Sequence, residues 1–248
     1  MSSEPLARLI AGAAEWGVPL SDESLKRFAL FAAKLEEVNQ QMNLTRVPPE
    51  EYETLHFLDS LALLTLHKPA PGARLLDVGT GAGFPGLPLA FVCPELKVTL
   101  LDGTKKRLNF LDETISELGL TNVTTVQGRA EELVNNKAHK LKYDIVVARA
   151  VAKLSVLATW LLPLTAPGGI VVAYKSMEVD EEISDAIVLI ERSGATLELV
   201  ARVILRGTDI VRKLVVLLKN ATRNAPKKVT GKREKTRPKK VKEVNDEE

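Results

Sequence analysis

The chain has 248 residues, 45% of them hydrophobic, which is enough for one sizeable hydrophobic core with an appendage. Cys93 is the only cysteine, so the composition excludes an internal disulfide and fits a reducing compartment. Charged residues among the first fifteen positions interrupt any signal-peptide core. We therefore expect a cytoplasmic protein.

Residues 1–70 are predicted to form an N-terminal helical cap. Ser21 is a candidate N-cap for a helix over residues 21–40, where apolar side chains recur at helical spacing. A second helix is predicted over residues 48–67, with Pro49 near its start and Pro69 beyond its end.

From residue 73, strand-like segments alternate with helix-like segments. The strand-like segments are 73–78, 97–102, 122–126, 143–148 and 169–175, and the helix-like segments are Phe84–Val92, Thr104–Leu118, Arg129–Val134, Lys153–Leu162 and 178–194. This alternation predicts an α/β fold whose parallel sheet is covered on both faces.

Two further strand-like segments, 195–205 and 211–220, follow with only a short loop at Gly207 between them. A connection this short joins antiparallel strands. Five parallel strands closed by a C-terminal antiparallel hairpin are typical of the class I S-adenosylmethionine-dependent methyltransferase fold, a Rossmann-like fold. We predict this domain over residues 71–220.

The longest stretch without a charged residue runs from Leu154 to Tyr174, long enough for a transmembrane helix. Prolines and glycines within residues 163–169 divide it into a helix-like and a strand-like half. Breaking backbone hydrogen bonds is costly in lipid, so we interpret the stretch as buried core and expect no membrane association.

The net charge of +2 conceals an uneven distribution. Residues 220–248 contain ten Lys or Arg and five acidic residues, which leaves 24 basic and 27 acidic residues elsewhere. A tail at 221–248 with so few apolar residues is predicted to be disordered. Its charge suits a polyanion such as RNA, although a purely solubilising terminus has the same composition.

The stretch "RLLDVGTGAGFPGLP" at residues 74–88 predicts a cofactor-binding turn between a strand and a helix. Gly79 and Gly81 are followed by Gly83, and Phe84 takes the place of the last glycine of a dinucleotide fingerprint. This spacing favours S-adenosylmethionine over a pyrophosphate-containing cofactor. Asp77 either serves this site or only caps the turn.

Asp102 ends the second predicted strand, about twenty residues after the glycine turn. A carboxylate in this position can accept hydrogen bonds from both ribose hydroxyls of an adenosine cofactor. Asp102 therefore supports an adenosine ligand, and the terminal hairpin and glycine spacing favour methyl transfer.

Several possible target atoms of methylation can be excluded from the sequence. Cys93 lies at the end of the first helix-like segment after the turn and fits a small buried hydrophobe better than a cytosine-methylating nucleophile. The sequence "ARAVAKL" stands where an Asn/Asp-Pro-Pro-aromatic motif would indicate amine methylation. The three histidines, His56, His67 and His139, are scattered, so no metal site is expected.

Guanine N7 remains compatible with these exclusions. It carries a free lone pair and needs no proton removed, so alignment and electrostatics suffice for its methylation. The lack of an obvious general base permits this interpretation without establishing it.

Several segments together resemble the ribosomal RNA small-subunit methyltransferase G family, also called the glucose-inhibited division protein B family. They are "MNLT" (42–45), "HFLDSL" (56–61), "DVGTGAGFPGLPLA" (77–90), "LLDGTKKRLNFL" (100–111), "GRAEE" (128–132), "DIVVARAVAKL" (144–154) and "RKLVVLLKN" (212–220). The resemblance implies S-adenosylmethionine-dependent methylation of N7 of a guanine in 16S rRNA, free or in a small-subunit assembly particle.

The resemblance also implies roles for individual residues. Those at the cofactor would be Gly79, Thr80, Gly81, Gly83, Phe84, Asp102, Gly103, Thr104, Ala130, Glu131 and Arg149, and those near RNA would be Arg129, Lys175 and Arg212. Arg149 would be catalytic, between the cofactor and the target base. Asn43 and His56 would either contact substrate or hold the cap to the core.

Two alternatives stay open at this stage. One is a class I methyltransferase for a small molecule or protein, with an incidental tail, and the other is a non-catalytic RNA-binding assembly factor. The intact glycine turn, Asp102 and Arg149 argue against the second. No motif fixes the oligomeric state, for which we favour a monomer.

Overall fold

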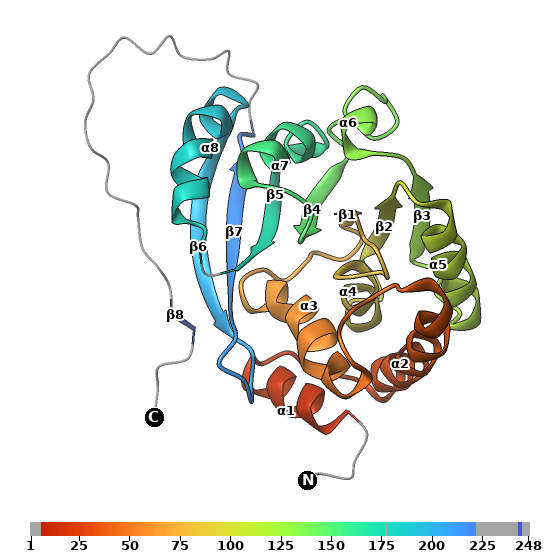
Figure 1. Cartoon of the computed structure of the whole chain (residues 1–248). Coiled ribbons are helices and arrows are strands. Elements are labelled where there is room, and N and C mark those ends of the chain that lie inside the picture. The colour runs from red at the N-terminus through yellow and green to blue at the C-terminus, as the bar shows by residue number, and fades with distance from the viewer. Residues whose placement is uncertain (1–5, 177, 222–242, 245–248) are drawn as a thin grey trace, which may run out of the picture.

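The computed structural model describes residues 6–176, 178–221 and 243–244. Its centre is a sheet with the strand order β3-β2-β1-β4-β5-β7-β6-β8 (Figure 1). The last of these, β8 (Glu243–Val244), is a short pairing beside β6 within the predicted tail. Apart from Ala221 and β8, that tail lies outside the described residues.

The predicted strands are confirmed. They are β1 (Arg74–Val78), β2 (Lys97–Asp102), β3 (Val123–Gln127), β4 (Tyr143–Arg149), β5 (Thr165–Lys175), β6 (Ala195–Ile204) and β7 (Val211–Lys219). Strands β1 to β5 pair in parallel, and β7 pairs antiparallel with both β5 and β6. The class I methyltransferase architecture expected from the alternation and the terminal hairpin is therefore present.

Helices cover both faces of the sheet (Figure 1). One face packs against α6 (Ala130–Leu133), α7 (Leu154–Leu161) and α8 (Asp180–Arg192) in a single apolar cluster. The other face packs against α4 (Gly86–Val92), α5 (Lys105–Glu117) and the N-terminal helices. The N-terminal helices thus share a core with the sheet.

The first N-terminal helices are regular. They are α1 (Ala7–Glu15) and α2 (Asp22–Met42). The predicted cap at Ser21 is confirmed, since its hydroxyl accepts a hydrogen bond from the Ser24 amide at 3.1 Å.

Residues 49–65 are helical, but the prediction of one regular helix over 48–67 is wrong. A 3₁₀ turn, η1 (Pro49–Glu51), leads into a π-helix, η2 (Tyr52–Leu58), then into α3 (Asp59–Leu61) and a second 3₁₀ turn, η3 (Ala62–Thr65). Residues 56–64 of the segment are buried, and the segment meets α1 as well as side chains of β4, β5 and β7. Its irregular pitch therefore accompanies tertiary contacts that the local pattern does not show.

The uncharged stretch that invited a transmembrane interpretation forms α7 and the long strand β5. Within the described ranges, no helix has the length and apolar character that crossing a bilayer requires.

Candidate active site

The turn after β1 is organised by Asp77, whose side chain is fully buried. Its Oδ2 atom accepts hydrogen bonds from the Thr80 hydroxyl at 2.7 Å and from the Gly86 amide at 2.8 Å. The carboxylate thereby ties the beginning of the turn to the first residue of α4. A capping role for Asp77, one of the two predicted roles, is therefore real.

The glycines of the turn adopt conformations that other residues rarely take. Gly79, Gly81 and Gly83 have φ values of 68°, 62° and 100°. A Cβ atom at Gly79 would lie 2.9 Å from Val151 Cγ2, whereas a Cβ atom at Gly81 would have nothing within 4 Å. The turn is therefore packed against the β4–α7 loop at Gly79 and open at Gly81.

The second oxygen of Asp77, Oδ1, is buried and has no hydrogen-bond partner among the described residues. Burial raises the pKa of this carboxyl to about 6, against the opposing effect of its hydrogen bonds to Thr80 and Gly86. An unmatched acceptor beside an open glycine turn suits a ligand that brings its own hydrogen-bond donor.

Asp102 at the end of β2 connects the glycine turn to the next strand. Its side chain accepts hydrogen bonds from the Gly81 amide at 3.0 Å and from the Thr104 amide at 2.8 Å, and Arg107 Nη1 lies 3.4 Å away. A carboxylate has about four acceptor positions, so capacity for a ribose hydroxyl is left. Gly103 is exposed beside it. Ribose binding itself stays a prediction.

The start of α6 carries three predicted site residues. Ala130 is buried, whereas the Glu131 side chain is about half exposed and lies 4.0 Å from Arg129 Nη1. The Arg129 side chain is 73% exposed, so its charge is available to a partner in solution. Its backbone is close to the Asp102 edge, because the Gly128 amide donates to the Asp102 carbonyl at 3.2 Å.

Arg149 at the end of β4 lies in a cluster of charged and aromatic side chains. Its Nη1 atom donates to Asp59 Oδ2 at 2.7 Å, and its guanidinium carbon lies 5.1 Å from the centre of the Phe84 ring. The other oxygen of Asp59 accepts a hydrogen bond from Arg212 Nε at 2.7 Å. One fully buried carboxylate therefore bridges two of the predicted site residues.

His56 belongs to the same cluster and stacks on Phe84, with ring centres 4.3 Å apart. Its Nε2 atom is 2.7 Å from the Thr45 hydroxyl, and its Nδ1 atom is 3.4 Å from Arg149 Nη2. Burial is the main cause that lowers the pKa of His56 to about 3, and the neighbouring Arg149 charge contributes to the same shift. The ring is neutral, and because the Arg149 guanidinium can only donate, an acceptor at Nδ1 with the proton on Nε2 is the tautomer that matches both contacts.

Lys175 forms an ion pair within the protein, and Asn43 caps the end of α2. Lys175 Nζ lies 2.6 Å from Glu182 Oε2 and donates to the Ala152 carbonyl at 2.8 Å. Asn43 ends α2 in the left-handed conformation, with φ at 49°, which asparagine tolerates better than most residues. The ion pair and the helix cap account for these two residues without a substrate, and RNA contact by Lys175 stays a prediction.

Cys93 is half-buried and packs at the edge of the apolar core, which agrees with its predicted role as a small hydrophobe. In the part of the chain that the structure describes, no group of three or more His, Cys, Asp or Glu side chains could hold a metal ion.

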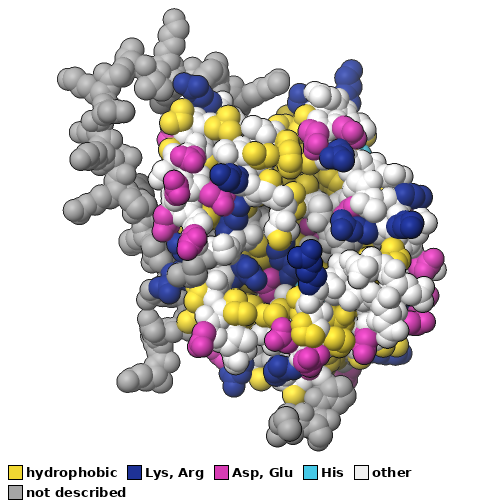
Figure 2. Space-filling model, viewed as in Figure 1, with side chains coloured by type: hydrophobic (Ala, Val, Ile, Leu, Met, Phe, Trp, Pro, Cys, Tyr) yellow, Lys and Arg dark blue, Asp and Glu magenta, His cyan; other side chains and the backbone are white. Residues whose placement is uncertain are grey.

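Basic side chains gather over this edge of the sheet. Figure 2 shows Lys and Arg over the middle of the face where β4 and β5 end in Figure 1, with acidic side chains mostly toward the rim.

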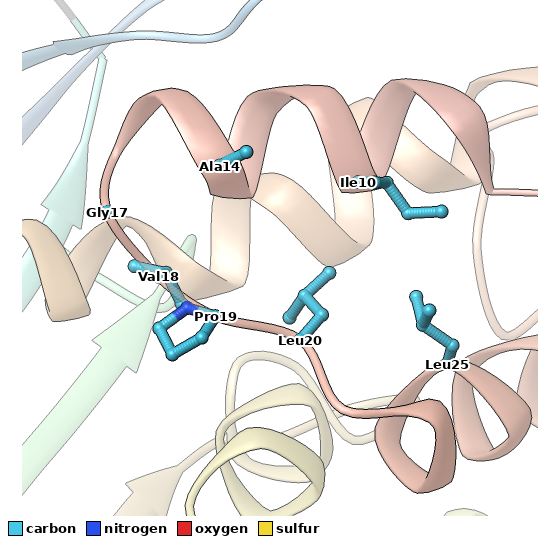
Figure 3. Close-up of a pocket in the computed structure, with 7 residues that line it drawn as sticks. All are labelled: Ile10, Ala14, Gly17, Val18, Pro19, Leu20 and Leu25. Carbon is cyan, nitrogen blue, oxygen red and sulfur yellow. The ribbon is translucent and has the colours of Figure 1, made fainter.

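A hollow of about 520 Å³ lies elsewhere, between α1 and the start of α2 (Figure 3). Its lining is Ile10, Ala14, Gly17, Val18, Pro19, Leu20 and Leu25, which offers no side chain for chemistry.

Asp59 lies at the centre of the arginine cluster, but the sequence analysis did not single it out as a site residue. It lies in the segment "HFLDSL", as a lone carboxylate within an apolar run. Such a residue signals a buried ion pair, because an unpaired charge is rarely buried. The sequence carries no sign of which cations meet it.

Comparisons with known proteins identify the family of this chain. The GidB family, described as rRNA small subunit methyltransferase G, matches residues 24–204. Ribosomal RNA small subunit methyltransferase G of Thermoanaerobacter sp. (strain X514) is 40% identical over 88% of this chain and 92% of its own. The protein of the same name from Lachnoclostridium phytofermentans is 42% identical over 85% and 87%.

Solved structures share the fold at lower identity. TrmN from Thermus thermophilus superposes with a TM-score of 0.54 at 24% identity, over 67% of this chain and 49% of that one. Precorrin-6y C5,15-methyltransferase from Geobacter metallireducens gives a TM-score of 0.50 at 17% identity, over 65% and 87%.

Proposed function

We propose, from the premise that this chain belongs to the rRNA small subunit methyltransferase G family, that it methylates N7 of a guanine in 16S rRNA. The chain is a methyltransferase, and its methyl donor is S-adenosylmethionine. When bound, this donor supplies an electrophilic methyl group on a sulfonium centre.

The residues at the sheet edge fit such a donor. The turn is open at Gly81, and Asp77 Oδ1 lacks, among the described residues, the hydrogen-bond donor that an amino group would bring. Asp102 retains acceptor capacity for a ribose hydroxyl at the neighbouring strand end. Gly79, Gly81, Phe84 and Asp102 would hold the donor.

The observation that carries the proposal is the position of Arg149 over Phe84, beside the open glycine turn. A base brought to the transferring group beside the glycine turn would meet this fixed positive charge. His56 is neutral and engaged at both ring nitrogens, so it is not poised to remove a proton. A target nitrogen with a free lone pair, such as guanine N7, needs no such removal.

RNA binding would involve the exposed cation Arg129 and the basic side chains at the same edge. Lys175 and Arg212 are weaker candidates, because each is largely buried and closely paired with a carboxylate, whereas Arg129 is mostly exposed and only 4.0 Å from Glu131. We further propose that the protein acts as a monomer in the cytoplasm, on rRNA or on a small-subunit assembly particle.

Methylation assays test this function directly. Purified full-length protein with labelled S-adenosylmethionine is expected to modify one guanine of 16S rRNA at N7, located by mass spectrometry of nuclease fragments. Free rRNA, an assembly intermediate and the finished small subunit should be compared as substrates. Transfer to none of them, together with no calorimetric heat on adding S-adenosylmethionine, would refute the proposal.

Mapping the rRNA methylation of cells that lack the protein separates this function from the two alternatives, another substrate class and a non-catalytic assembly factor. Cells without the protein should lose one N7-methylguanine from their rRNA. An unchanged map despite cofactor binding would indicate another substrate class. A retained methyl group alongside an assembly defect would indicate a non-catalytic factor.

A further inference from the structure

We infer that Asp59 is a positioning residue for methyl transfer: its carboxylate holds the Arg149 guanidinium against Phe84 and makes the N-terminal cap part of the active site. This inference rests on the proposed function, in which Arg149 is the catalytic cation. Asp59 itself is hydrogen-bonded to Arg149 and Arg212 rather than to the glycine turn, so it acts through the arginine.

The contacts of Arg149 show why it needs positioning. A free arginine side chain samples many rotamers, and fixing it costs entropy. Here its guanidinium meets Asp59 Oδ2 at 2.7 Å, the Leu55 carbonyl at 3.2 Å and His56 Nδ1 at 3.4 Å. These three contacts all come from residues 55–59 of the cap, and only the contact with the Phe84 ring comes from elsewhere. The cap therefore sets the direction of the guanidinium.

The irregular helix of the cap explains how one short segment supplies three contacts. The π-helix η2 presents the Leu55 carbonyl and the His56 ring to Arg149, and Asp59, the first residue of α3, follows it directly and presents its carboxylate to the same arginine. Single π-turns occur frequently at functional sites. The departure from regular helix thus coincides with the cation that the proposed reaction requires.

The charge balance of the cluster also favours a role beyond packing. Asp59 is fully buried and meets two cations, Arg149 and Arg212, so the group carries a net positive charge when all three are ionised. The Arg149 side chain is 14% exposed and that of Arg212 is 23% exposed. A single anion between two arginines fixes both while leaving positive charge for an anionic substrate.

A neighbouring contact offers a matched control. The Tyr174 hydroxyl donates to the Ser60 carbonyl at 2.8 Å and so joins the cap to β5 one residue from Asp59. Tyr174 is buried, and this hydrogen bond goes to the cap backbone rather than to the Arg149 guanidinium. Tyr174→Phe removes one cap–sheet hydrogen bond and leaves the Asp59 carboxylate in place.

The experiment compares Asp59→Asn and Tyr174→Phe with the wild type in the full chain, using 16S rRNA or the particle that the wild type methylates. Asp59→Asn is expected to lower kcat by about 10-fold or more, with the Kd for S-adenosylmethionine changed less than about threefold. Tyr174→Phe is expected to lower the Tm by a few degrees and to keep kcat within about twofold of wild type.

A double-mutant cycle distinguishes positioning from general stability. If Asp59 acts through Arg149, Asp59→Asn lowers kcat in the wild-type background but has no further effect in an Arg149→Ala background. The inference would be overturned if the double variant lost kcat by the product of the two single-variant factors. A wild-type kcat for Asp59→Asn would overturn it as well. If Asp59→Asn does not fold, Asp59→Glu is used. A wild-type kcat in folded Asp59→Glu, whose carboxylate is displaced by one methylene, would equally overturn the inference.

Failure of the proposed function gives a different result. In that case the wild-type protein methylates no rRNA substrate. A wild-type enzyme that is active, with an inactive Arg149→Ala variant and a fully active Asp59→Asn variant, would leave the function standing and remove only the role of Asp59.

Discussion

Asp59 and Asp77 are both fully buried aspartates near the same edge of the sheet, yet they are compensated differently. Asp77 meets two neutral donors, Thr80 and the Gly86 amide, and one of its oxygens has no partner among the described residues. Asp59 meets a guanidinium on each oxygen. The first carboxylate shapes a loop, whereas the second joins the cap to two strands.

The difference teaches how each site is assembled. The hydrogen-bond partners of Asp77 lie within nine residues along the chain, so its turn is a local structure. The partners of Asp59 are 90 and 153 residues away, so the arginine cluster exists only when the cap docks on β4 and β7. Perturbations of the two aspartates should therefore separate loop stability from cap docking.

The largest effect is expected for Arg149→Ala. Loss of this cation should lower kcat about 10²- to 10³-fold. It should also lower the free energy of unfolding by about 1.5–3 kcal/mol, because Asp59 loses one charged hydrogen bond and keeps Arg212 as a charged partner. Single-turnover kinetics and urea unfolding measure the two effects. A near wild-type rate would show that the site lies elsewhere.

Asp77→Asn should change the pH dependence of stability. The pKa of Asp77 is about 6 in the folded protein and 3.8 in the unfolded chain, so the folded state binds more protons between these values. The carboxyl therefore destabilises the wild type by about 2 kcal/mol as the pH rises from 4 to 7. Asparagine does not titrate, so the variant should gain about this much relative to wild type over the same range.

Urea unfolding of the wild type and of Asp77→Asn at several pH values measures this difference in the pH dependence of stability. The opposing titration of His56, whose lowered pKa removes stability as the pH falls below 6.5, is present in both chains and cancels. Parallel stability curves would mean that Asp77 is ionised throughout the range and that its burial is better compensated than the contacts indicate.

Thr80→Val should have a smaller effect on the same carboxylate. It removes the 2.7 Å hydrogen bond to Asp77 Oδ2 and should cost about 2 kcal/mol at pH 7, with less loss at pH 4, where Asp77 is protonated. Thr114→Val is the matched control, because the buried Thr114 hydroxyl donates to the Phe110 carbonyl. A pH-independent cost for both variants would contradict the expected role of Thr80.

The smallest effect is expected at an exposed cation outside both clusters. Arg129→Ala should leave the free energy of unfolding almost unchanged and reduce the slope of log affinity for RNA against log salt by about 0.7–0.9. Binding measured across a salt series tests this. Lys175→Ala provides the comparison, and a larger slope change there than at Arg129 would reverse our ranking of the two residues.

The sequence was sufficient for the strand order along the chain, the terminal hairpin and the glycine turn. Each depends on features within a few residues, such as the apolar runs, Gly79 to Gly83 and the short loop at Gly207. It also placed Arg149 correctly at the end of β4. It did not give the π-helix, because the apolar pattern of residues 48–67 is compatible with more than one helical pitch.

What the sequence by itself determined is local: which segments become strands, where a carboxylate lies at the end of β1 and β2, and which cations end up near the same edge. The tertiary structure decided which of those cations are paired. Lys175 meets Glu182, and Arg149 and Arg212 share Asp59, whereas Arg129 stays exposed. The reason is physical, because charge pairing and pKa depend on burial and on distances between residues far apart in the chain.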